Sequence, residues 1–401
     1  MPVTDRWPPR VLLVEEVGLG GIAEYAGELG QALAQSGWEV HLATARDHDS
    51  AAAPEVIVHR VFPYVRGRRR LGRLVRRLRL SRPLNGATHL AGDLVVARLA
   101  RRCDVVHVQG EEWPPLGAIQ ALLLRATGRP VVYTPHNTFD RGPRSYPRAH
   151  RLIRRCAARL VVHSEYDRRA LSPAQARKAV VIAHGEYGSL ARRGGLGADP
   201  EAARAELGGR REELVVLLFG QLRRDKGVRD LLEAAAEVEG VRVVLAGEDR
   251  GALGEAADLL ADPRLRGRVE VLRGFLPVER VSRLFAAADV VALPYPRASA
   301  SGVLLLAYGY GRPVLCYPVG GLPEYVIDGH TGWLCERADA AALVDSLRAV
   351  RAAGREECCA RGETARRFAQ ERFGWDSIAQ VTVTLYEEVL AAGHPSATSR
   401  G

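Results

Sequence analysis

Short runs of apolar, often β-branched residues alternate with stretches of helical periodicity along the whole chain. This alternation is typical of parallel sheets joined by crossover helices, so it predicts an α/β fold of two doubly wound, Rossmann-like domains. The first series of strands is expected at Val11–Val14, Glu39–Ala43, Val56–His59, Val105–Val108, Val131–Thr134, Leu160–His163 and Val180–Ile182. The second series is expected at Leu214–Phe219, Val241–Ala246, Val269–Leu272, Val290–Leu293 and Pro313–Cys316.

A segment rich in glycine and polar residues, 185–200, separates the two series. The chain has 401 residues, more than one domain usually contains, so we interpret this segment as a linker. We place an N-terminal domain at 1–190, a C-terminal domain at 191–375 and a flexible tail at 393–401. Ligands of doubly wound sheets bind beyond the carboxyl ends of the strands, so the expected site is a cleft between the domains.

The composition is that of an ordinary globular protein, with 47% hydrophobic and 26% charged residues. The chain does not open on an apolar leader segment, and no apolar run approaches the roughly 18 residues that cross a bilayer. We therefore expect a cytoplasmic protein. The six cysteines lack the paired spacing of a metal site, so reduced thiols and no structural zinc are expected.

The formal net charge of +10 favours anionic partners. Almost every basic residue is an arginine, and lysine occurs only at Lys178 and Lys226. A lysine kept where arginine is the default indicates a position that needs a compact ammonium charge. Lys226 is therefore a candidate ligand for an anion.

A glycine-rich segment, 18–23, follows the first expected strand and opens a helix. It matches the G-x-G-x-x-G/A fingerprint of dinucleotide-binding proteins, and Arg46 after the second strand would suit a 2′-phosphate. An NADP-dependent oxidoreductase is therefore one alternative. The other interpretation is that the glycines only permit a tight turn, since no dehydrogenase-like catalytic set follows.

The C-terminal domain contains a second glycine turn between a strand and a helix, and this turn also carries basic side chains. Gly220 to Gly227 follow a buried strand, carry Arg223, Arg224 and Lys226, and open a helix at Val228. Backbone N–H groups, the helix dipole and fixed cations together predict a diphosphate site. The alternative is a solvated basic turn.

Three further turns in this domain suit a nucleotide. Gly274 and Phe275 end a strand in a loop that can seat a flat base, although Phe275 can equally belong to the core. Ser299 to Val303 precede an apolar helix, and another glycine turn begins at Gly320.

Taken together, these segments resemble glycosyltransferase family 4, a group of retaining enzymes of the GT-B fold that use nucleotide sugars. The resemblance spans nearly the whole chain. It rests on 18–21, Thr134–Asn137, Ile182–Gly185, Phe219–Gly227, Gly274–Phe275, Ala288–Pro294 and Gly320–Gly332. It also implies that a terminal helix at 376–392, after Phe373-Gly374-Trp375, crosses back to the N-terminal domain.

The resemblance assigns roles to individual residues. Lys226, with Arg223, would neutralise the donor diphosphate, and His136 would contact the transferred sugar. In the family an arginine usually stands where this chain has Gln221, so its role passes to Arg223. The diphosphate and sugar would also meet Gly20, Gly21, Gly220, Ser299, Ser301, Gly302 and Val303. The nucleoside would meet Gly247, Gly274, Phe275 and Leu306. No metal or other cofactor is expected.

The chain departs from the family at its Glu-x7-Glu pattern, which would fall on Ala298 and Leu306. Ser299 and Ser301 can replace part of the lost hydrogen bonding. Leucine cannot accept a hydrogen bond from a ribose hydroxyl, which favours a 2′-deoxyribose and hence a dTDP-sugar used in specialised-metabolite or cell-surface glycan synthesis. The alternative is a catalytically degenerate, GT-B-like partner protein.

Two arginine clusters lie in the N-terminal domain, which receives the acceptor in this fold. One includes Arg68, Arg69 and Arg70, and the other includes Arg144. They predict binding either of an acceptor that carries a hydroxyl group and a negative charge or of an anionic membrane surface. The alternative is that they form a solvated helical face. Aromatic residues do not interleave with these arginines, so nucleic acid is not expected. We expect no metal at 47–49 either, despite the Asp-x-Asp pattern.

Overall fold

A computed structural model describes residues 8–48, 53–64, 81–138, 146–195, 199–210 and 212–393. The chain divides into two compact units. The first unit comprises Met1–Gly185 and Trp375–Gly401, and the second comprises Glu186–Gly374. From the sequence we expect these boundaries at 190 and 375.

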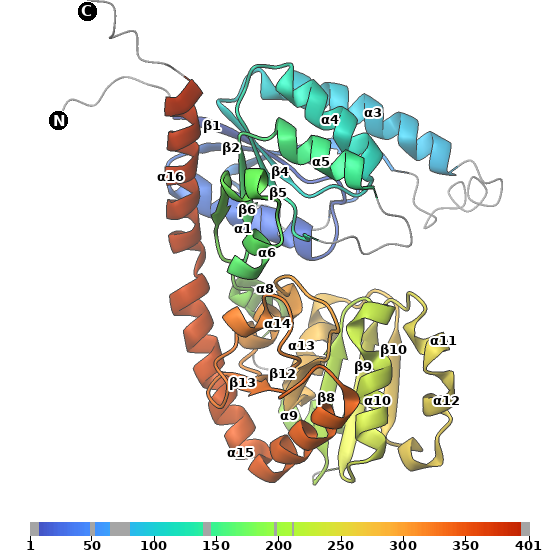
Figure 1. The fold of residues 1–401 in the computed structure, drawn as a ribbon. Coiled ribbons are helices and arrows are strands. Elements are labelled where there is room, and N and C mark those ends of the chain that lie inside the picture. Colours follow the sequence, from blue (N-terminus) through green and yellow to red (C-terminus); the bar gives the residue numbers. More distant parts are fainter. Residues whose placement is uncertain are drawn as a thin grey trace, which may run out of the picture. The chain divides into compact units, whose positions relative to one another are not determined.

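The first unit is built on a seven-stranded sheet with the order β3-β2-β1-β4-β5-β6-β7, in which every pair of neighbours is parallel (Figure 1). The order reverses between β1 and β4, as in doubly wound sheets. The strands are β1 Arg10–Val14, β2 Glu39–Ala45, β3 Val56–Phe62, β4 Val105–Gln109, β5 Val131–Thr134, β6 Arg159–Val162 and β7 Ala179–Val181.

Helices cover both faces of this sheet, because successive residues of a buried strand point to opposite sides. Val11 and Leu13 of β1 belong to one apolar cluster, and Leu12 and Val14 belong to another. The helices are α1 Gly21–Gln35, α3 Ser81–Ala100, α4 Pro114–Arg125, α5 Pro147–Cys156, α6 Glu165–Arg169, α7 Pro173–Ala176 and α16 Trp375–Gly393.

The terminal helix α16 packs against α1 in the first unit. The Tyr386 hydroxyl lies 2.6 Å from Nδ1 of His107 in β4, which ties the helix to the sheet. At its start, the Trp375 ring lies so close to Gly185 that a Cβ at that glycine would stand 2.2 Å from a ring carbon. The return of a C-terminal helix to the N-terminal part of the chain is therefore confirmed.

The second unit has a six-stranded parallel sheet of order β10-β9-β8-β11-β12-β13. Its order reverses between β8 and β11. Val216 and Leu218 of β8 face a core shared with α10 and α15, whereas Val215 and Leu217 are buried on the other face. The strands are β8 Leu214–Phe219, β9 Val241–Gly247, β10 Val269–Arg273, β11 Val290–Leu293, β12 Val314–Cys316 and β13 Gly332–Leu334.

The helices of the second unit vary widely in length. They are α8 Gly188–Gly194, α9 Pro200–Glu206, α10 Val228–Ala236, α11 Ala252–Glu255, α12 Ala257–Leu260, α13 Val278–Ala287, α14 Gly302–Gly309 and α15 Ala340–Phe373, with 3₁₀ turns η1 Arg224–Lys226, η2 Pro263–Leu265 and η3 Leu322–Glu324. The backbone of α15 leaves the helical region at Gly354.

Each strand expected from the sequence has a counterpart in the structure, and the α/β fold with two Rossmann-like units is confirmed. His163 and Ile182 lie one residue beyond the strands in which we expect them. The pattern did not indicate β13, whose three residues are too few to show a period.

Candidate functional site

In the second unit, the loops that follow β8, β9, β10 and β11 leave the same edge of the sheet, because these strands are parallel. Strand β8 pairs with both β9 and β11, and this is the point where the strand order reverses. Ligands of open parallel sheets bind at such a point, beyond the carboxyl ends of the strands. The predicted diphosphate turn follows β8. Of the predicted nucleoside residues, Gly247 ends β9, Gly274 and Phe275 follow β10, and Leu306 lies within helix α14.

The ends of β8 and β9 approach each other closely. Gly247 has a φ of +142°, and a Cβ there would stand 1.8 Å from the carbonyl oxygen of Gly220. The Gly274 amide donates to the Gly247 carbonyl at 2.9 Å, so the loop after β10 joins the same group. Gly220, Gly247 and Gly274, which we expect at the donor site, are thus brought together.

The turn from Gly220 to Gly227 places Lys226 at the end of a 3₁₀ turn. Gly227 follows in the left-handed region, with φ +64° and ψ +32°, and is the N-cap of α10. Its Cα lies against the loop after β11, where a Cβ would be 1.9 Å from the Pro294 carbonyl oxygen. The Lys226 ammonium lies 3.7 Å from the centre of the neighbouring Tyr295 ring, which holds it by a cation–π contact.

The two arginines of this turn have carboxylate partners. Arg223 donates from Nε and Nη2 to both oxygens of Asp225, at 2.8 and 2.7 Å. This pairing raises the pKa of Arg223. Arg224 forms an ion pair with Glu255 and is 82% exposed. The charge of Arg223 is therefore balanced within the turn, and its predicted role at the diphosphate stays a prediction.

Helix α14 begins beside this turn. A Cβ at Gly220 would stand 3.6 Å from a methyl group of Val303. Ser301 is the N-cap, and its hydroxyl accepts from the Leu304 amide at 3.4 Å. Gly302 and Val303 form the first turn, where backbone amides have no partner within a helix. These amides can therefore receive an anion, as we expect from the sequence.

The residues at the positions of the family's two glutamates are both buried. Ala298 is 7% exposed and Leu306 is 6% exposed, and Ser299 between them is 1% exposed. Phe275, by contrast, is 65% exposed. The alternative that Phe275 belongs to the core is therefore wrong.

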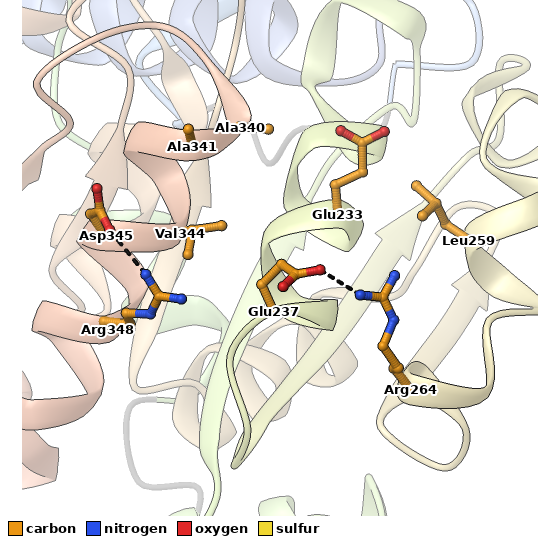
Figure 2. Close-up of a pocket in the computed structure, with 9 residues that line it drawn as sticks. All are labelled: Glu233, Glu237, Leu259, Arg264, Ala340, Ala341, Val344, Asp345 and Arg348. Atoms are coloured by element: carbon orange, nitrogen blue, oxygen red, sulfur yellow. Dashed lines mark hydrogen bonds and ion pairs between the residues drawn. The ribbon is translucent and has the colours of Figure 1, made fainter.

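A separate groove of about 440 Å³ lies in the second unit between α10, α12, η2 and the start of α15 (Figure 2). The residues that line it are Glu233, Glu237, Leu259, Arg264, Ala340, Ala341, Val344, Asp345 and Arg348. Its charged side chains form ion pairs, Arg264 with Glu237 and Arg348 with Asp345. None of the predicted site residues that the structure describes lines this groove.

In the first unit, three histidines follow the consecutive strands β5, β6 and β7. They are His136, His163 and His184, and their rings surround that of Tyr25 from α1 at centroid distances of 4.9 to 5.3 Å. Burial lowers the pKa of His184 to about 3 and also lowers the pKa of His163. Both rings are therefore neutral near pH 7. The sequence indicated His136 for a role but not His163.

Gly20 and Gly21, also expected at the donor, stand at the start of α1. Gly20 has a φ of +83° and is the N-cap, and Gly21 is the first residue of the helix. Tyr25 lies one turn further along α1. The start of this helix and the histidine cluster thus belong to one region of the first unit.

A buried acidic group, which the sequence did not indicate, lies beyond the end of β1. The Gln120 amide donates to Glu16 Oε1 at 3.1 Å and to Asp93 Oδ1 at 2.7 Å. His89 Nε2 lies 3.6 Å from Glu16 and 3.5 Å from Asp93. Burial raises the pKa of Asp93 to about 7, raises the pKa of Glu16, and lowers that of His89 to about 4. The group holds α3 and α4 against β1.

Several predictions concern residues outside the described part of the chain. These residues are Arg68, Arg69, Arg70, Arg144 and Asp49. Among the described residues, no group of three or more His, Cys, Asp or Glu side chains could hold a metal ion. Within the same ranges, no helix combines the length and the apolar character that crossing a membrane requires.

Comparison with known families gives two matches. A sequence model described as "Glycosyltransferase Family 4" matches residues 19–185, and one described as "Glycosyl transferases group 1" matches residues 213–352. The two matches together cover most of the chain and fall in the two units separately.

Several curated relatives carry the name D-inositol 3-phosphate glycosyltransferase. The protein of Mycobacterium avium is 34% identical over 199 residues, which are 48% of this chain and 46% of that protein. The protein of Streptomyces coelicolor is 34% identical over 201 residues, 47% of this chain and 43% of that protein. The chain thus spans about half the length of the curated relatives it matches.

Solved structures are similar over a greater length. Sucrose-phosphate synthase from Thermosynechococcus elongatus superimposes with a TM-score of 0.73 and 21% identity, covering 96% of this chain and 100% of that one. Starch synthase IV from Arabidopsis thaliana, bound to ADP and acarbose, superimposes with a TM-score of 0.74 and 15% identity, covering 96% of this chain and 100% of that one. Anabaena Alr3699/HepE in complex with UDP-glucose superimposes with a TM-score of 0.68 and 22% identity, covering 96% of this chain and 99% of that one. These likenesses confirm the expected fold.

Proposed function

Because the chain belongs to glycosyltransferase family 4, we propose that it transfers a sugar from a nucleoside diphosphate to a hydroxyl group of an acceptor. One observation carries the proposal. The turn that carries Lys226 starts at Gly220, where a Cβ would stand 3.6 Å from Val303 in the first turn of α14, at the reversal point of the second sheet. The lysine charge and the helix amides both suit a diphosphate. The family match supports the same assignment.

In the proposed mechanism, the second unit holds the donor and stabilises the leaving group. The bond between C1 of the sugar and the diphosphate breaks, and its electron pair passes to the diphosphate. The acceptor oxygen bonds to C1 on the face that the diphosphate leaves, and its proton passes to a phosphate oxygen. Lys226 and the amides of Gly302 and Val303 stabilise the negative charge that develops. The sugar therefore keeps its anomeric configuration.

His136 of the first unit would contact the sugar, and the glycines at the start of α1 would approach the diphosphate. Arg223 can join Lys226 only by sharing its guanidinium between Asp225 and the phosphate. Protein cations and amides would thus do the work that a divalent ion does elsewhere.

We expect transfer to continue in EDTA and to give a retained linkage. The test uses mass spectrometry to find a donor and acceptor pair, followed by NMR of the product's anomeric proton with and without the chelator. A product of inverted configuration contradicts the retaining mechanism. Turnover that stops in EDTA and returns with magnesium or manganese contradicts the absence of a metal requirement.

The donor nucleotide is proposed to be a dTDP-sugar. Leu306 stands where the family has a glutamate that accepts from the ribose hydroxyls. An unpaired hydroxyl beside this side chain costs about 1–3 kcal/mol, so UDP-glucose should react about 5- to 150-fold less efficiently than dTDP-glucose. Comparison of kcat/KM for hydrolysis of the two donors measures this difference.

A Leu306→Gln variant supplies an acceptor and should move the preference towards UDP-glucose. Leu305→Gln is the matched control, because Leu305 is also buried on α14 but does not stand at the family's glutamate position. A wild-type preference for UDP-glucose, or the same change in both variants, contradicts the role of Leu306.

The acceptor is proposed to be phosphorylated or otherwise anionic. The net charge of +10 supports this proposal, as does the name that the curated relatives carry. Arg68, Arg69, Arg70 and Arg144 are the candidate residues, either for the acceptor or for peripheral contact with an anionic membrane. We propose that such a product belongs to specialised-metabolite or cell-surface glycan synthesis.

A further inference from the structure

His136 occupies an unusual backbone conformation at the end of β5. Its φ is +49°, and among the described residues no other non-glycine residue has a positive φ. This backbone conformation costs a non-glycine residue about 1–3 kcal/mol, so contacts with neighbouring residues must hold His136 in it. Two side chains contact the His136 ring from neighbouring strands, and each meets one ring nitrogen.

His163 meets the first nitrogen. Its Nε2 lies 3.2 Å from His136 Nδ1, and its own Nδ1 lies 3.0 Å from the carbonyl oxygen of Ile182. A carbonyl oxygen only accepts, so His163 must carry its proton on Nδ1. Burial lowers the pKa of His163, so the ring is neutral and its Nε2 is an acceptor. The proton between the two rings therefore belongs to His136 Nδ1.

Gln109, the last residue of β4, meets the second nitrogen. Its Oε1 lies 3.0 Å from His136 Nε2. Its Nε2 is buried and has no hydrogen-bond partner among the described residues. The amide can present its oxygen to a protonated Nε2 or, after a half-turn, its N–H group to an unprotonated Nε2. Gln109 thus accommodates both protonation states of His136, whereas His163 accommodates only a proton on Nδ1.

We propose that His163 and Gln109 are positioning residues, and that they make Nε2 the ring nitrogen through which His136 acts on the transferred sugar. His163 fixes the Nδ1–H tautomer through its bond to Ile182, and Gln109 orients the ring through its contact with Nε2. The inference rests on the proposed function, because this orientation matters to catalysis only if His136 acts on the transferred sugar. It adds to that function the tautomer and the residues that set it.

The packing around the three rings supports a fixed orientation. Tyr25 contacts His136 edge-on, at an interplanar angle of 84°, and also packs against Trp375. His184 donates from Nδ1 to the Gly185 carbonyl at 2.9 Å, which orients the third ring in the same way as Ile182 orients His163. Rotation of the His136 ring would therefore disturb several buried contacts.

The tautomer can be measured directly. In protein labelled with ¹⁵N-histidine, long-range ¹H–¹⁵N correlation spectra distinguish the protonated from the unprotonated ring nitrogen. A His136→Asn variant identifies the signals of His136 by their loss. At a pH where His136 is neutral, we expect a protonated Nδ1 and an unprotonated Nε2. A neutral ring with the proton on Nε2 would overturn the proposal without any measurement of activity.

Variants of His163 test the consequence for turnover. His163→Phe keeps a ring but removes the acceptor, whereas the Gln side chain in His163→Gln supplies one. With UDP-glucose and dTDP-glucose as probes, we expect His163→Phe to lower kcat for hydrolysis by about 10- to 100-fold, the effect of a misplaced reacting group. The His163→Gln variant should recover most of this loss. Calorimetry should give an unchanged Kd for UDP or dTDP.

His59→Phe is the matched control. His59 Nε2 lies 2.9 Å from His41 Nδ1 on β2 and β3, so this change breaks a similar pair of histidines away from β5 and β6. An equal fall in kcat for His59→Phe and His163→Phe, or an unchanged His136 tautomer in His163→Phe, would overturn the positioning role. Wild-type protein that neither binds UDP or dTDP nor hydrolyses their sugars contradicts the proposed function instead. The tautomer measurement then still tests whether His163 positions His136.

Discussion

Replacing Gly227 with alanine should lower the free energy of unfolding by about 2–5 kcal/mol and weaken nucleotide binding as well. The left-handed conformation costs a residue with a Cβ about 1–2 kcal/mol. Overpacking adds about 1–3 kcal/mol, since the new Cβ would stand 1.9 Å from the Pro294 carbonyl oxygen and a backbone atom cannot turn aside. Relief of the overlap must move either α10 or the loop that carries Tyr295, and Lys226 lies over that ring.

Denaturant unfolding followed by circular dichroism, together with calorimetry of UDP and dTDP binding, measures both effects. Gly254→Ala is the matched control, because Gly254 lies in α11 of the same unit and a Cβ there would meet no atom within 4 Å. The control should unfold like the wild type or be slightly more stable. If the two variants are equally stable and bind nucleotide equally well, the close approach of the two loops does not build the site.

Replacing Lys226 with alanine should weaken the binding of UDP or dTDP by about 1.5–3 kcal/mol, or roughly 10- to 150-fold, which is the range for hydrogen bonds to charged groups. Lys226 lies over the ring of Tyr295, and the carboxylates of Asp225 and Glu255 pair with Arg223 and Arg224. The loss should therefore appear in affinity, with little change in the stability of the fold.

Arg224→Ala removes the same charge two residues away. Arg224 is 82% exposed and paired with Glu255, so its loss should change nucleotide affinity by less than about 0.5 kcal/mol. Calorimetry on both variants separates a local contact from a general effect of net charge. If Lys226→Ala costs no more affinity than Arg224→Ala, the basic turn is a solvated surface feature, which was the alternative interpretation of the sequence.

The fold could be predicted from the sequence because its signals are local. Buried parallel strands require continuous apolar runs, and the crossover helices require an amphipathic period, so both appear in the order of residues. The glycine turns after β1 and β8 were visible for the same reason. The dinucleotide-binding alternative arose from one of those turns alone, and the match of both units to glycosyltransferase families excludes it as the identity of the chain.

The sequence by itself determined which strands form, which turns contain the glycines and which position keeps a lysine among arginines, because each of these depends on neighbouring residues. Only the tertiary structure decided which side chains pair. Asp225 balances Arg223, Phe275 is exposed rather than part of the core, and His163 and Gln109 reach His136 across neighbouring strands. Gln109 and His136 are 27 positions apart in the sequence, and so are His136 and His163, which makes 54 positions from Gln109 to His163. Contacts at that separation depend on the order of strands in the sheet, which a local pattern does not contain.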